Sequence, residues 1–236
     1  MMSEVPVITV DGPSGTGKGT VCFRLAGILN WHMLDSGALY RTLAVAALKA
    51  GIGLGDTPEL SRLAGALDVS FREASDGTGF AVYLGEEEVT PLIRTEKCGN
   101  AASKIAPYPG VRQGLLMRQR AFKQPPGLIA DGRDMGTVVF PDAPLKIYLT
   151  ASPAERAKRR YKQLMEQGFS VNLARLSAEI AERDDRDQGR TQSPLKPAPG
   201  AFVIDTTGVI IEEVDRQVQD LVRKTFPGIA DQLPIN

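Results

Sequence analysis

The sequence is poor in the residues that build metal centres and disulfide frameworks, with two cysteines and one histidine in 236 residues. Cys22 and Cys98 lie far apart, form no C-x-x-C pair, and have only His32 as a further candidate ligand. This spacing argues against a zinc site or a disulfide framework, and it is typical of proteins from a reducing compartment. We therefore expect a cytoplasmic protein.

Excess charge and long apolar runs are also missing. The 28 Lys and Arg residues balance the 28 Asp and Glu residues, so the formal net charge is zero. A neutral chain argues against binding to nucleic acid or to an anionic membrane through bulk charge. Because the chain has neither an apolar run of about 18 residues nor a signal-like start, we expect no membrane span and no export. A charged ligand must therefore meet a local cluster of charges.

What the sequence does contain is an alternation of short apolar runs with amphipathic stretches. This alternation predicts an α/β fold in which helices flank a parallel sheet. The expected strands are 5–10, 33–35, 128–131, 145–150 and 201–205, and the expected helices include 18–29 and 36–50. A further helix should begin after Ser152, because Ser152, Pro153 and Glu155 form a capping pattern.

One segment, 55–100, interrupts this alternation. Val69–Phe71, Phe80–Leu84 and the turn at 85–89 are typical of short antiparallel strands rather than of a helical crossover. No linker long enough to separate two autonomous domains occurs. We therefore predict a single domain over 1–236 that carries a small antiparallel insert at 55–100.

A glycine-rich string joins the first predicted strand to the first predicted helix. It consists of Gly12, Pro13, Ser14, Gly15, Thr16, Gly17, Lys18, Gly19 and Thr20. In this context the backbone N–H groups form an anion nest, the helix start adds a positive dipole end, and Lys18 reaches the β- and γ-phosphates. We interpret the string as an ATP-binding phosphate loop rather than as an ordinary glycine turn.

The loop departs from the usual pattern at Gly19, where a magnesium-binding hydroxyl normally stands. Asp131 ends the apolar run 128–130, and it should lie at the carboxyl edge of the sheet, beside the phosphate loop. A carboxylate there can hold Mg²⁺ through water, although a capping role in a turn is the alternative. Arg133 and Asp134 follow in the same loop, within reach of an acceptor phosphate and a base edge.

Arginine outnumbers lysine 18 to 10 and is clustered. Guanidinium groups suit phosphoryl transfer, since the transition-state charge lies on the peripheral oxygens of the transferred group. We regard Arg133 together with Arg156, Arg159 and Arg160 as candidate catalytic residues, with Lys18 and Asp131. For the three on the 153–190 stretch, a solvated helix face paired with nearby acids is the alternative.

Three further segments carry a resemblance to a known family. Leu34–Arg41, Ile129–Thr137 and Glu182–Asp187, together with the G-K-G-T of the phosphate loop, resemble bacterial cytidylate kinases, which are nucleoside monophosphate kinases with a P-loop fold. The resemblance runs from about residue 5 to about residue 225. It implies transfer of the γ-phosphoryl group of ATP to CMP or dCMP with Mg²⁺, an acceptor-binding insert at 55–100 and a lid at roughly 153–190. We also expect a monomer that acts on small nucleotides.

The resemblance also implies roles for individual residues. Ser36 and Arg41 match acceptor-side contacts, with Arg41 and Arg133 on the monophosphate. Ser103, Arg112 and Asp134 match positions that read the cytosine ring. Arg183 and Asp187 match positions that hold the ribose, and Arg190 matches a further acceptor-side arginine. Arg156, Arg159 and Arg160 match the lid.

Other functions stay open at this point. A P-loop kinase for UMP or for another small acceptor such as shikimate uses the same loop. A GTPase-like switch would account for Asp205–Gly208 as a D-x-x-G element, but the chain lacks an N-K-x-D guanine motif. A noncatalytic nucleotide-binding protein is a further alternative, but the presence of Lys18, Asp131 and the arginines argues against it.

Overall fold

The computed structural model describes residues 5–73, 80–166, 168 and 170–234. The chain divides into two compact units, one formed by Met1–Leu34 and Phe122–Asn236 and the other by Asp35–Ala121. The segment 55–100 falls inside the second unit. Each unit is described by itself below.

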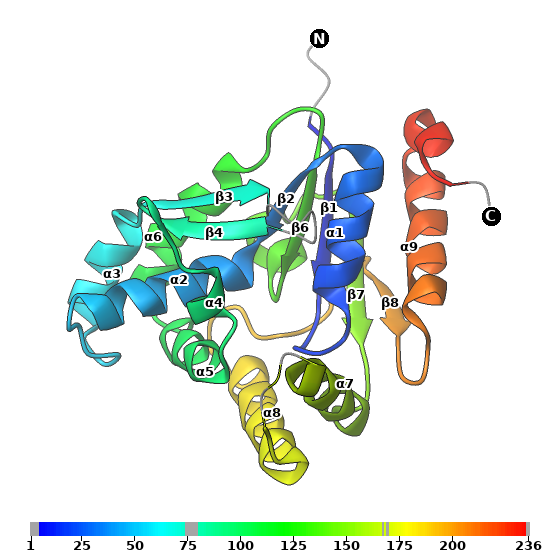
Figure 1. Cartoon of the computed structure of the whole chain (residues 1–236). Helices are drawn as coiled ribbons and strands as arrows, with labels where there is room; N and C mark the ends of the chain where they lie inside the picture. The colour runs from blue at the N-terminus through cyan, green and yellow to red at the C-terminus, as the bar shows by residue number, and fades with distance from the viewer. Residues whose placement is uncertain (1–4, 74–79, 167, 169, 235–236) are drawn as a thin grey trace. The chain divides into compact units, whose positions relative to one another are not determined.

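A five-stranded sheet forms the centre of the first unit (Figure 1). Its strands are β1 (Val7–Asp11), β2 (His32–Asp35), β6 (Leu128–Gly132), β7 (Leu145–Thr150) and β8 (Phe202–Asp205), in the order β2-β6-β1-β7-β8. β1 runs parallel to both of its neighbours, β6 and β7, and β7 runs parallel to β8. Every residue of β1 and β6 is buried, as expected for central strands covered on both faces. The predicted parallel sheet is confirmed.

The helices of the first unit are α1 (Lys18–Leu29), α7 (Pro153–Glu166), α8 (Leu173–Gln188) and α9 (Ile211–Thr225), with a short π-helix η1 (Met135–Val139) and a 3₁₀ helix η2 (Pro227–Gln232). α1 and α9 lie side by side in Figure 1 and contribute to one hydrophobic core with the sheet. Ile8 of β1, Leu25 of α1 and Val218 of α9 belong to that core. Cys22 is buried in the same core, as expected of a small apolar residue.

α7 and α8 pack against each other through a small apolar cluster of their own. Ala157 and Leu164 of α7 meet Leu176 and Ile180 of α8 in this cluster. The start of α7 has the expected cap, since the Glu155 N–H donates to Ser152 Oγ at 3.2 Å. The helical pair occupies the stretch where the sequence predicts a lid, and closure of that lid stays a prediction.

The second unit combines helices with a three-stranded antiparallel sheet. Its helices are α2 (Ser36–Lys49), α3 (Thr57–Gly65), α4 (Thr90–Ile93), α5 (Glu96–Ile105) and α6 (Pro109–Ala121), and its strands are β3 (Val69–Glu73), β4 (Phe80–Leu84) and β5 (Glu87–Glu88). β4 pairs antiparallel with both β3 and β5. The short antiparallel strands expected within 55–100 are therefore confirmed. Among the described residues, no helix is both long enough and apolar enough to cross a membrane.

Candidate active site

The glycines of the loop at 12–20 allow it to turn tightly against the sheet. Gly12 has a φ of 145° and Gly17 a φ of 91°, both in the region that side chains other than glycine rarely adopt. A Cβ atom on Gly12 would lie 2.0 Å from the Leu149 carbonyl oxygen of β7. Gly12 therefore permits a backbone approach that no other residue allows, and the loop is set directly over the carboxyl ends of β1 and β7.

Lys18 is held inside this loop. Its Nζ donates to the Pro13 carbonyl oxygen at 2.7 Å, and the Thr16 hydroxyl donates to the same oxygen at 3.1 Å. Lys18 is only 5% exposed. The pKa of Lys18 is lowered to about 8, chiefly by burial and also by the charge of Arg133, while Asp131 acts in the opposite direction. Because the buried Lys18 ammonium group has lost its hydration, it would bind a phosphate anion strongly.

The helix that follows the loop adds to the positive potential. α1 begins at Lys18, its N-cap is Gly17 with no side-chain cap, and no acidic residue lies in its first turn. The N–H groups at this helix start therefore have no carboxylate from the first turn to neutralise their partial charge. Loop, lysine and helix start together form a phosphate-binding geometry.

Asp131 lies beside the same helix start, as the sequence predicts. In the sheet Asp131 is paired with Val10 of β1, one residue before the end of that strand. A Cβ atom on Gly19 would lie 3.7 Å from Asp131 Oδ2. The carboxylate therefore faces the position where a phosphate loop usually carries a hydroxyl.

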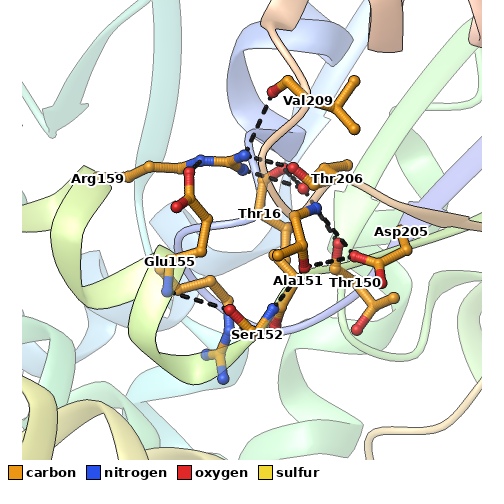
Figure 2. Close-up of polar contacts among 11 residues, drawn as sticks. Thr16, Thr150, Ala151, Ser152, Glu155, Arg159, Asp205, Thr206 and Val209 are labelled. Atoms are coloured by element: carbon orange, nitrogen blue, oxygen red, sulfur yellow. Dashed lines mark hydrogen bonds and ion pairs between the residues drawn. The ribbon is translucent and has the colours of Figure 1, made fainter.

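A polar network centred on Thr206 joins the phosphate loop to α7 (Figure 2). The buried Thr206 hydroxyl lies 3.3 Å from the Thr16 carbonyl oxygen and 3.0 Å from the Thr150 carbonyl oxygen, and it accepts a hydrogen bond from Arg159 Nη1 at 3.0 Å. Arg159 also donates to the carbonyl oxygens of Thr206 and Val209 and to the Glu155 carboxylate. This side chain therefore ties α7 to the loop after β8.

The Asp205 carboxylate makes hydrogen bonds within the same loop. It accepts from both the N–H and the hydroxyl of Thr207, and the Thr207 hydroxyl in turn accepts from the Ser152 N–H at 2.9 Å. These bonds from Thr207 lower the pKa of Asp205. The D-x-x-G string thus closes a turn between the ends of β7 and β8.

Arg156, also on α7, is 3% exposed. Its guanidinium donates to the Ser14 carbonyl oxygen at 3.3 Å, to the Ala151 carbonyl oxygen at 3.0 Å, and to the Asp184 carboxylate of α8. Arg156 therefore connects the phosphate loop to both helices of the predicted lid. Arg160, one turn along α7, donates to Gln163 Oε1 at 2.6 Å.

Asp187 gathers three of the predicted acceptor-side arginines. Its Oδ2 accepts from Arg133 Nε at 3.1 Å and its Oδ1 accepts from Arg190 Nη2. Burial by itself would raise the pKa of Asp187, but the positive charges of Arg133, Arg190 and Arg183 outweigh it and hold the pKa below its usual value. The structure thus brings Arg133, directly after β6, into one charged cluster with Arg183 and Asp187 of α8 and with Arg190, which follows α8.

The comparisons with known proteins agree with this geometry. The family model described as cytidylate kinase matches residues 8–224. The chain belongs to the cytidylate kinase family. It is 57% identical over 222 residues to the cytidylate kinase of Shewanella frigidimarina (strain NCIMB 400), covering 94% of this chain and 97% of that protein. It is 58% identical over 218 residues to the cytidylate kinase of Nitrosococcus oceani (strain ATCC 19707), covering 92% and 96%.

The acceptor-side residues predicted for this member of the cytidylate kinase family belong to both units. Arg133, Asp134, Arg183, Asp187 and Arg190 lie in the first unit, whereas Ser36, Arg41, Ser103 and Arg112 lie in the second. Ser36, Ser103 and Asp134 are buried. Their contacts with an acceptor nucleotide stay predictions.

In the second unit, α2 and α6 position Ser36. Its hydroxyl donates to Gln119 Oε1 at 2.8 Å, and Gln119 is 2% exposed. The start of α2 is fixed by Asp35, whose carboxylate accepts from the Ala38 N–H at 2.9 Å. Arg112 donates to the Ala106 carbonyl oxygen at 3.4 Å, across the turn between α5 and α6.

Sequence reasoning missed several residues that hold this cytidylate kinase site together. They are Asp11, Gln119, Asp184 and Thr206, and each is buried. Thr206 and Asp11 do stand next to motifs that the sequence shows, since one follows a predicted strand and the other precedes the phosphate loop. Asp184 lies within the Glu182–Asp187 segment, although the resemblance implies no role for it, and Gln119 lies on a helix without any local signal. Their partners are distant in sequence, so no local pattern identifies them.

Proposed function

We propose that the protein transfers the γ-phosphoryl group of ATP to CMP or dCMP, giving CDP or dCDP and ADP. Membership of the cytidylate kinase family supports the acceptor. The observation that carries the phosphoryl-transfer part is the buried Lys18, held at 2.7 Å from the Pro13 carbonyl oxygen inside a loop that meets the uncapped start of α1. This arrangement is built to receive the β- and γ-phosphates.

In the proposed reaction an oxygen of the acceptor monophosphate attacks the γ-phosphorus, and the bond to the bridging oxygen of ADP breaks. The protein supplies position and charge rather than a covalent nucleophile. Lys18 and the N–H groups of the phosphate loop hold the donor phosphates. Arg133, oriented by Asp187, holds the acceptor phosphate and opposes the charge that develops on the transferred group.

Arg156, Arg159 and Arg160 are proposed to act as the lid arginines. Arg156 and Arg159 make hydrogen bonds to backbone carbonyl oxygens around the phosphate loop. These bonds hold both guanidinium groups next to the loop, which limits the side-chain entropy that phosphate binding would cost. Closure of α7 and α8 would then exclude water, which competes with the acceptor for the γ-phosphoryl group.

The donor set at the phosphate loop fits Mg²⁺ held through water. Asp131 supplies a hard oxygen ligand facing Gly19, and among the described residues no group of three or more His, Cys, Asp or Glu side chains could hold a metal ion by itself. Mg²⁺ usually keeps several waters and binds through one or two carboxylates and the substrate phosphates. Bound there, the ion would neutralise charge on the donor phosphates.

For the acceptor base, Asp134 with Ser103 and Arg112 is proposed to read cytosine. A carboxylate accepts from the cytosine amino group, while a hydroxyl and a guanidinium donate to its ring nitrogen and carbonyl oxygen. Uracil presents a carbonyl in place of the amino group, which would leave the carboxylate without a donor. Arg41, Ser36, Arg183 and Arg190 complete the proposed contacts to phosphate and ribose.

We also propose that the enzyme works as a monomer in the cytoplasm on small nucleotides. The zero net charge supports small phosphorylated ligands over nucleic acid polymers. Light scattering of the purified protein, with and without ATP and CMP, tests the oligomeric state.

The experiment that tests the proposed function is ADP release measured with ATP and Mg²⁺ across CMP, dCMP, UMP, AMP and shikimate. We expect release to depend on the acceptor and to be fastest with CMP and dCMP. Equal, slow release without any dependence on the acceptor would instead indicate an ATPase or a switch. Faster release with UMP or shikimate would indicate a kinase for that acceptor.

A further inference from the structure

Asp11 is a buried carboxylate that none of the roles above uses. It is the last residue of β1 and is 2% exposed. Its Oδ1 accepts a hydrogen bond from the Met135 N–H at 2.9 Å, and its Oδ2 accepts one from the Gly136 N–H at 2.8 Å. Both carboxylate oxygens are therefore committed to the backbone of one segment, more than 120 residues away in the sequence.

That segment is the direct continuation of the predicted acceptor loop. Arg133 and Asp134 directly precede the π-helix η1, which begins at Met135. Asp134 is the N-cap residue of η1, and its side chain makes no capping hydrogen bond. Fixing the N–H groups of Met135 and Gly136 therefore fixes the backbone from which Asp134 projects. Short π-helices occur often at functional sites.

The segment also lies close against β1. A Cβ atom on Gly136 would lie 2.9 Å from Thr9 Oγ1 and 3.2 Å from Ala198 Cβ. Two residues of β1 therefore contact Gly136: Thr9 packs against it, and Asp11 accepts a hydrogen bond from its N–H. The loop has two independent attachments to β1 and cannot shift along it without losing both.

Its surroundings disfavour the charged form of the Asp11 carboxylate. The pKa of Asp11 is raised to about 7, chiefly by burial and also by the charges of Asp134 and Asp131, although the hydrogen bonds from Gly136 and Met135 act against the rise. Elsewhere the chain caps helices from nearby, partly exposed positions, as Asp56 does for the Glu59 N–H at 3.2 Å. A buried acid beside two other acids is a poor choice for stability alone.

We propose that Asp11 is a positioning residue for the acceptor nucleotide: by holding the Met135 and Gly136 N–H groups, it orients Arg133 and Asp134 for the acceptor phosphate and base. This inference rests on the proposed function, because it assumes that those two residues contact the acceptor. Since Asp11 directly precedes Gly12, the same residue also joins the acceptor loop to the start of the phosphate loop.

The test compares Asp11→Asn with wild type and with Asp220→Asn. Asparagine keeps the shape at position 11 but offers one accepting oxygen, and its amide N–H₂ opposes the second backbone N–H. We expect D11N to raise the KM for CMP about tenfold and to reduce the preference for CMP over UMP, with the KM for ATP within about threefold of wild type. D220N makes the same chemical change on the exposed face of α9, where the Asp220 carboxylate accepts from Arg223 Nη1 at 2.8 Å, and it should leave all three values unchanged.

Two results would overturn the inference. One is a D11N enzyme with the wild-type KM for CMP and the wild-type preference for CMP. The other is a parallel rise of both KM values, which is the effect of a general structural defect. If wild type itself shows no CMP-dependent ADP release, the proposed function fails, whereas an active wild type with an unaltered D11N variant defeats this inference alone.

A measurement on the unaltered protein covers the case in which D11N does not fold. Amide hydrogen exchange at Met135 and Gly136 should slow when CMP is added, and change less when an ATP analogue is added, because the acceptor is held by the loop that these amides anchor. Equal slowing by both ligands, or no slowing by CMP, contradicts the proposal.

Discussion

The phosphate loop and the predicted acceptor residues are positioned in different ways. The loop takes its lysine, its glycines and its helix start from the single stretch 12–20, and Lys18 already contacts the loop backbone. The acceptor residues come from 36–41, 103–112, 133–134 and 183–190, and they are divided between the two units. The comparison teaches that the proposed donor site is organised by local backbone geometry, while the proposed acceptor site relies on long-range partners such as Asp187 and Asp11.

The largest effect should come from the centre of the donor site. Lys18→Ala removes the buried ammonium group and should lower kcat/KM by about 10²–10³-fold, since the charge on the donor phosphates loses its nearest partner. Steady-state kinetics with saturating CMP measure the loss, and thermal unfolding measures the fold. A K18A enzyme with wild-type kcat would show that the loop does not act in transfer.

The matching change on the acceptor side is Asp134→Ala. It should reduce the preference for CMP over UMP by about tenfold to a hundredfold, because the cytosine amino group loses a buried acceptor. The ratio of kcat/KM for the two acceptors measures this, and the KM for ATP serves as an internal control. Unchanged selectivity would place base recognition elsewhere and remove the contrast between the two sites.

A smaller effect is expected where the donor site does use long-range contacts. Thr206→Val removes the hydroxyl that links the Thr16 carbonyl oxygen to Arg159. The KM for ATP should rise about five- to tenfold, corresponding to one buried hydrogen bond, and the KM for CMP should stay near wild type. Thr206→Ser should restore the ATP value.

Thr225→Val is a matched control for that substitution, since the Thr225 hydroxyl donates to the Leu221 carbonyl oxygen at 2.8 Å inside α9. Its KM values should equal those of wild type. If T206V weakened both substrates alike, the network around Thr206 would be a general structural element rather than a support of the donor site.

The smallest effect is a pH dependence. The pKa of Lys18 is lowered to about 8, first by burial and then by Arg133, so the ammonium group loses its proton as the pH rises through 8. The kcat/KM for ATP should therefore fall about fourfold between pH 7 and pH 8.5, through this single ionisation. In the ATP complex the phosphates stabilise the ammonium form, so kcat should fall only at higher pH.

Lys18→Arg gives the control for this profile, since a guanidinium group keeps its charge throughout the range. Whatever its residual activity, the decline of kcat/KM between pH 7 and pH 8.5 should be absent in K18R. A decline that persists in K18R comes from another group.

Much of the fold could be predicted because its signals are local. The β-branched run before Gly12, the cap at Ser152 and the short apolar run at Phe80–Leu84 each depend on neighbouring residues, and each expected element is present. The strand order β2-β6-β1-β7-β8 has no such signal, because periodicity reports burial but not the identity of the neighbouring strand.

For the candidate site the same division holds, residue by residue. The sequence alone determined the phosphate loop, the place of Asp131 at the end of its strand and the resemblance to cytidylate kinases, because spacing and residue type carry that information. Only the tertiary structure decided that Asp187 pairs with Arg133, that Thr206 meets Thr16, and that Asp11 holds Met135 and Gly136. These bonds join residues far apart in the chain, and a buried polar group finds its partner only when the whole fold brings the two together.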